Sequence, residues 1–73
     1  MAEPWTASVY SKRAQTVAYD PDSKTMTVTW RDGRATVYLD VPEDHAVALS
    51  KAASVGQMIN AEFTGQYQHR NIK

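Results

Sequence analysis

Cysteine is absent from this chain of 73 residues. No disulfide can therefore cross-link the fold and no thiolate can bind a metal, as is typical of proteins from a reducing cytosol. The two histidines, His45 and His69, lie too far apart in the sequence for the short ligand spacing of a zinc site. We expect no metal and no cofactor, so the hydrophobic core alone must stabilise the fold.

The chain also lacks an excess of charge, because eight basic residues balance eight acidic ones. Proteins that bind nucleic acid through its phosphates usually carry a basic excess, so this balance lowers the expectation of a function in nucleic-acid binding alone. No apolar run approaches the ~20 residues of a membrane span, and the N-terminus lacks a signal-peptide pattern. We expect a cytoplasmic protein with neither a membrane nor a small-molecule partner.

Glycine is scarce, and the three glycines occupy expected turn and cap positions rather than a phosphate-binding loop. A nucleophile, a base and an orienting group around one pocket are not indicated either. His45 follows Glu43 and Asp44 in a predicted helix, where a solvated histidine is the usual case. The sequence therefore predicts a protein that is not an enzyme.

The strongest positive signal is a β-hairpin over residues 25–39. Residues 25–30 alternate threonine with Met26, Val28 and Trp30, the period of a half-buried strand. Asp32-Gly33 then offers the pair that a two-residue type I′ turn requires, and the second strand returns after it. Its register is open, since the buried face holds either of two pairs: Thr36 with Tyr38, or Val37 with Leu39.

Flanking patterns complete the predicted fold. Residues 13–19 alternate as a first strand that ends in the Pro-containing turn at 20–23. Pro42 and the acidic residues after it predict a helix over 42–53. Gly56 is placed for a left-handed cap, and residues 57–63 predict a short second helix. The fold class is α+β: a three-stranded antiparallel β-meander covered by one α-helix plus a short second helix.

The two ends of the chain show no periodicity. We assign residues 1–12 and 66–73 to flexible tails that flank a domain at residues 13–65. Trp5 permits two interpretations. It folds back onto the core, which its residue type favours, or it stays exposed and contacts a partner.

Short motifs spread over most of the chain after residue 10 resemble those of the KTSC domain. This small domain is found alone in bacteria and phages and at the C-terminus of some lysyl-tRNA synthetases. The motifs are Tyr19-Asp20, Val41-Pro42, and Ser54, Gly56 and Asn60 in a Ser-x-Gly-x-x-x-Asn pattern.

Two features of that family bear on this chain. Its central Tyr-x-Tyr falls on Thr36 and Tyr38, which implies that these two residues share the core face. RNA binding has been suggested for the family, but Thr64 stands where family members tend to carry an arginine.

Size and sequence also resemble those of a small phage-encoded protein that binds the host's bacterial RNA polymerase. The resemblance implies a monomeric, non-catalytic transcription regulator that blocks promoter-dependent initiation and favours terminator read-through. Its expected partner-binding residues are Trp5, Tyr10, Arg31, Arg34, Val37 and Leu39. The alternative is an RNA-binding accessory module, and the candidate contacts to nascent RNA are Tyr67, His69, Arg70 and Lys73.

Overall fold

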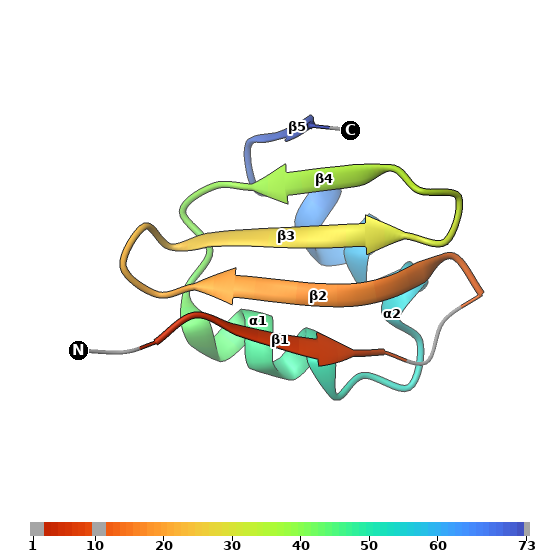
Figure 1. The fold of residues 1–73 in the computed structure, drawn as a ribbon, viewed down its shortest axis with the longest axis horizontal. Helices are drawn as coiled ribbons and strands as arrows, with labels where there is room; N and C mark the ends of the chain where they lie inside the picture. The colour runs from red at the N-terminus through yellow and green to blue at the C-terminus, as the bar shows by residue number, and fades with distance from the viewer. Residues whose placement is uncertain (1–2, 10–11, 73) are drawn as a thin grey trace.

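One antiparallel sheet, covered by helices on one face, makes up the fold of the computed structural model, which describes residues 3–9 and 12–72 (Figure 1). Tyr10 and Lys73 lie outside the described residues. The strands are β1 (Trp5–Ser8), β2 (Ala14–Asp20), β3 (Thr25–Trp30), β4 (Ala35–Tyr38) and β5 (His69–Asn71). Between β4 and β5 come the helices α1 (Glu43–Ser50), α2 (Val55–Met58) and the π-helix η1 (Ile59–Thr64).

The sheet has five strands, in the order β1-β2-β3-β4-β5, rather than the three that the sequence predicts. Its outer strands come from the two segments that were expected to be tails. Both are too short for a periodic pattern, and β5 has no buried side chain at all. Their extended state comes from pairing with the backbone of β2 and β4, which sequence patterns do not record.

The register of the central hairpin confirms that Thr36 and Tyr38 lie on the buried face. Tyr38 lies opposite Met26 and Thr36 opposite Val28, and all four side chains are buried. The turn is longer than the predicted type I′ pair. Trp30 and Arg34 close a three-residue loop through the Trp30 N–H and the Arg34 carbonyl at 2.8 Å, and Gly33 provides the positive φ of 94° that ends it.

The helices are confirmed in kind but differ in their bounds. Pro42 precedes α1 in an extended conformation, and α1 ends at Ser50 rather than near residue 53. Gly56 is not a left-handed cap, because it lies inside α2. None of the helices in the described part of the chain is long and apolar enough to cross a membrane.

A single core lies between the sheet and the helices. The sheet contributes Val17, Tyr19, Met26, Val28 and Tyr38, each at most 2% exposed. The helices contribute Ala46, Leu49, Val55, Ile59 and Phe63, which are equally inaccessible. All the helices cover the same face, so the opposite face of the sheet is left without a second layer (Figure 1).

Candidate functional site

The uncovered side of the sheet presents a continuous surface, which we call the outer face. Strand pairing aligns one residue from each strand in a row across it. The row is Thr6, Ala18, Thr27, Val37 and Arg70. Side chains of neighbouring rows are mainly small and hydroxylated, and they include Ser8, Thr16, Thr25 and Thr29.

Val37 is the largest aliphatic side chain in this row, and Leu39 follows it just beyond the end of β4. Both are half-buried although no helix covers them. They do not belong to an edge strand, because β5 pairs with β4 on the side that β3 leaves free. The Leu39 N–H donates to the Gln68 carbonyl at 2.9 Å and extends that pairing. A partner at these residues therefore has to contact side chains rather than add a strand to β4.

Trp5 folds back onto the protein, in agreement with the interpretation that its residue type favours. Its ring lies 5.8 Å from that of Tyr19, and its Nε1 donates to a carboxylate oxygen of Glu43 at 3.2 Å. The ring is therefore largely engaged within the chain, and only its half-exposed edge remains for a partner.

The segment around Tyr67 is held by a polar cluster that the sequence did not predict. Nδ1 of His45 hydrogen-bonds the Tyr67 hydroxyl at 2.7 Å, and Nε2 lies 3.0 Å from a carboxylate oxygen of Glu62. The imidazole also stacks on Phe63, with ring centroids 4.2 Å apart. The expectation of a solvated His45 is wrong, because its side chain is 20% exposed. Its partners lie in η1 and after it, at separations in sequence that no local pattern could reveal.

Two further candidate RNA contacts, His69 and Arg70, lie in β5. The ring of His69 lies 5.2 Å from that of Tyr38, and its Nδ1 lies 3.2 Å from the Tyr67 carbonyl. Arg70 is exposed at the end of the outer-face row. The structure thus separates Arg70 from Tyr67, whose hydroxyl points toward α1.

Thr36, where the resembled family carries a tyrosine, forms a second polar cluster under the sheet. Trp30 Nε1 donates to the Thr36 hydroxyl at 3.0 Å, and that hydroxyl donates to Asn71 Oδ1 at 2.8 Å. Thr36, which is smaller than the tyrosine of the resembled family, thus accepts the hydrogen bond of the Trp30 indole N–H and links β5 to the hairpin.

Arg31 and Arg34 lie at one end of the sheet, where the β3–β4 hairpin and the β1–β2 connection meet (Figure 1). Lys12 and Arg13 belong to that connection, so half of the chain's basic residues gather there, with Asp32 the acidic residue among them. We call this the basic end. The Asp32 carboxylate lies 3.6 Å from Arg34 Nε, and both side chains are well exposed.

Acidic residues gather at the opposite end of the sheet, around the β2–β3 turn, the start of β1 and the start of α1. These are Glu3, Asp20, Asp22, Asp40, Glu43 and Asp44. A chain of zero formal charge therefore has ends of opposite sign, a separation that its composition conceals.

No group of three or more histidine, aspartate or glutamate side chains converges to hold a metal within residues 3–9 and 12–72. The polar cluster around His45 connects elements of the fold and lines neither cleft described at the basic end. The cluster of Trp30, Thr36 and Asn71 forms part of the lining of the smaller of these two clefts. The two surfaces that are candidates for recognition of a partner are the outer face and the basic end.

Comparison with known proteins gives a family match. The family model described as the KTSC domain matches residues 10–73. A crystal structure of a KTSC domain protein from Yersinia pestis superposes with a TM-score of 0.86 at 27% identity, covering 96% of this chain and 99% of that one. No curated protein matches the chain significantly.

Proposed function

The chain belongs to the KTSC domain family, and from this premise we propose that it is a non-catalytic transcription regulator that binds bacterial RNA polymerase through its outer face. In this proposal it acts as a phage protein in the host cytoplasm, where it blocks promoter-dependent initiation and favours terminator read-through. It does so by occluding a contact between polymerase subunits, or by narrowing the path of nascent RNA so that a terminator hairpin does not form.

The observation that supports a protein partner is the character of the outer face. Val37 and Leu39 form an apolar strip along and just beyond β4, with the threonines of β3 on one side and Arg70 of β5 on the other. Protein interfaces combine an apolar centre with a polar rim. Threonine is stiff at χ1, so ordering these side chains against a partner loses little conformational entropy. The resemblance to a polymerase-binding phage protein supplies the identity of the partner.

Binding to purified bacterial RNA polymerase tests the proposal. We expect the wild-type chain to bind, and Val37→Asp to weaken the dissociation constant by about tenfold or more, because a carboxylate would be desolvated at the centre of the interface. Thr27 lies opposite Val37 on β3. Thr27→Arg is also expected to weaken binding, because the larger side chain would keep the partner from close contact with the outer face. Ala48→Asp is the matched control, because this residue is exposed on α1 behind the sheet.

The outcome against this proposal is equally definite. Polymerase that fails to bind the wild-type chain, or that binds the Val37 and Thr27 variants as tightly as the control, would refute it. The RNA-binding alternative predicts instead that the free protein binds single-stranded RNA in a filter assay, with an affinity that falls steeply with salt.

A further inference from the structure

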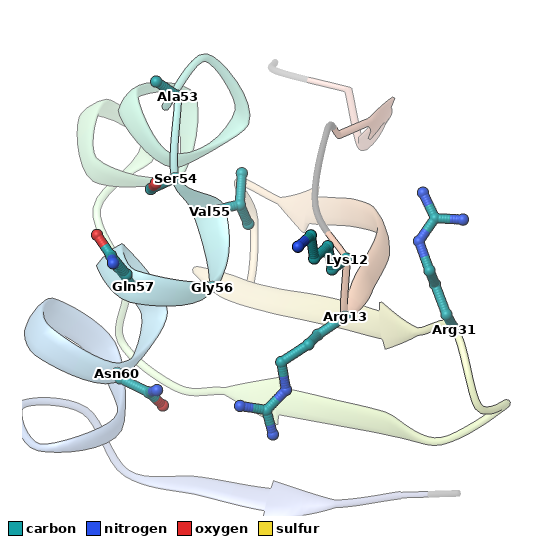
Figure 2. A pocket seen from close by; sticks show the side chains of 9 residues that line it. All are labelled: Lys12, Arg13, Arg31, Ala53, Ser54, Val55, Gly56, Gln57 and Asn60. Carbon is teal, nitrogen blue, oxygen red and sulfur yellow. The ribbon is translucent and has the colours of Figure 1, made fainter.

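A hollow lies at the basic end, beside α2. It has a volume of about 900 Å³, within the range of small-molecule sites. One wall comes from the β1–β2 connection and the end of β3, and the other from the loop before α2 and the helices after it (Figure 2). Its lining residues are Lys12, Arg13, Arg31, Ala53, Ser54, Val55, Gly56, Gln57 and Asn60.

The charge of this cleft is of one sign. Among the described residues that line it, three are basic and none is acidic. The opposite wall supplies Ser54, Gln57 and Asn60, whose hydroxyl and amide groups can donate hydrogen bonds. Figure 2 shows Lys12 and Arg13 extending toward the α2 side of the cleft. A concave site with positive charge on one wall and neutral donors on the other favours an anion.

The backbone fixes the two arginines beside each other. The Arg31 N–H donates to the Arg13 carbonyl at 2.8 Å, which ties the β1–β2 connection to the end of β3. The β2–β3 register shifts between Ala14 and Thr16, an irregularity of the kind that redirects a strand next to functional sites. The backbones of Arg13 and Arg31 are thus joined, while Figure 2 shows their side chains extending in different directions, that of Arg13 toward the side of Asn60.

A second hollow adjoins the first and shares its basic residues. It measures about 420 Å³, and Lys12, Arg13 and Arg31 line both. The second hollow adds Arg34 together with Asp32, whose carboxylate lies 3.6 Å from Arg34 Nε. A ligand with a single negative charge would use only part of this array. Guanidinium groups match the oxygens of phosphate groups in paired hydrogen bonds, and phosphates in series would engage several of them.

From these observations we propose that the cleft between the β1–β2 connection and α2 binds phosphate groups, in a nucleoside polyphosphate or in a nucleic-acid chain. This site is distinct from the outer face, and it does not depend on polymerase binding. Recognition of the rest of the ligand falls to Gln57 and Asn60, whose side-chain amides line the same cleft.

Amide NMR of the isolated chain tests this site with sodium pyrophosphate, ATP and a short single-stranded oligoribonucleotide as probes. We expect saturable shifts of the residue 54–57 amides, with affinity weakened by about tenfold in Arg13→Gln or Arg31→Gln, the loss expected for one charged hydrogen-bonding partner. Lys24→Gln removes a positive charge in the β2–β3 turn, at the opposite end of the sheet, and is expected to change the affinity less than about twofold. The amide spectrum of each variant verifies that it is folded.

The probes separate the two sources of phosphate. Saturable shifts with pyrophosphate and ATP assign the site to free nucleotides, whereas shifts with the oligoribonucleotide alone assign it to the phosphodiester backbone. Absence of saturable shifts with every probe would overturn the proposal, as would equal affinity in the Arg13, Arg31 and Lys24 variants. Sulfate at matched ionic strength controls for general salt effects, and shifts as large with sulfate as with pyrophosphate would also count against it.

Discussion

Tyr19 connects the core to the acidic end of the molecule. Its ring is buried, and its hydroxyl donates a hydrogen bond to the Val41 carbonyl. Burial raises the pKa of this phenol above its ordinary value, and the negative charges of Glu43, Asp20 and Asp44 raise it further. The neutral form is therefore the one that the fold stabilises.

Alkaline pH should weaken the fold through Tyr19. Because its pKa is higher in the folded chain, the unfolded chain releases the proton first, so this stabilisation is complete below about pH 10 and is lost as pH rises through the folded pKa. Tyr19→Phe should remove the part of the loss of folding stability at alkaline pH that comes from Tyr19. At neutral pH it should lower the free energy of unfolding by about 1–3 kcal/mol, because the Val41 carbonyl loses its donor. Urea unfolding from pH 7 to 11 measures both effects, and equal alkaline slopes in the two proteins would contradict the account.

His45 offers a second test at the scale of one side chain. His45→Ala removes the stacking on Phe63 and the hydrogen bond to Tyr67. We expect the free energy of unfolding to fall by about 1–3 kcal/mol. Hydrogen exchange should accelerate most in β5, which follows Tyr67 closely, while the amides of β3 serve as an internal control. Uniform acceleration across the sheet would show that the cluster does not hold the C-terminal strand locally.

Among the elements, β5 depends most on its partners. It has three residues, all exposed, and side-chain contacts from the covered face of the sheet hold it in addition to its pairing with β4. The hydrogen bond from the Thr36 hydroxyl to Asn71 is one of them.

Asn71→Ala should therefore loosen β5 without unfolding the domain. The expected loss is about 0.5–1.5 kcal/mol in the free energy of unfolding, the usual net contribution of one hydrogen bond. Faster exchange of the β5 amides and a changed Trp30 indole N–H resonance are the measurements, because Trp30 donates to the same hydroxyl. Arg70→Ala, on the opposite face of the same strand, is the matched control. Equal effects of the two substitutions would contradict this role for Asn71.

The elements also differ in how far the sequence predicts them. The hairpin of β3 and β4 is predictable because six residues alternate strictly and a glycine stands at the one turn position that needs positive φ. The edge strands β1 and β5 are not, since three or four residues carry too little pattern and their pairing partners lie elsewhere in the chain. The π-helical turn of η1 is likewise invisible in the sequence, because its apolar spacing fits an ordinary helix equally well.

At the scale of the whole molecule, the distribution of charge is what sequence composition misses. Equal numbers of acidic and basic residues lower the expectation of a function in nucleic-acid binding alone. Antiparallel pairing brings Lys12 and Arg13 to the same end as Arg31 and Arg34, although almost twenty positions separate the two groups. Candidate residues such as Arg31 and Val37 were identifiable from the sequence, but their separation into a basic end and an outer face required the fold.

The outer face is the other consequence of the whole architecture. Every helix in the described part of the chain lies on one side of the sheet, so Val37 and its row have no internal cover (Figure 1). We propose that bacterial RNA polymerase binds this uncovered surface, whereas the opposite face of the sheet packs against the helices in the core.

The most direct test is an amide NMR titration of the labelled chain with purified fragments of bacterial RNA polymerase. The account predicts that one fragment broadens or shifts the amides of Ala18, Thr27 and Val37, while those of the exposed side of α1, such as Ala48, stay unchanged. Perturbation confined to α1 and η1, or no perturbation by any fragment, would contradict it.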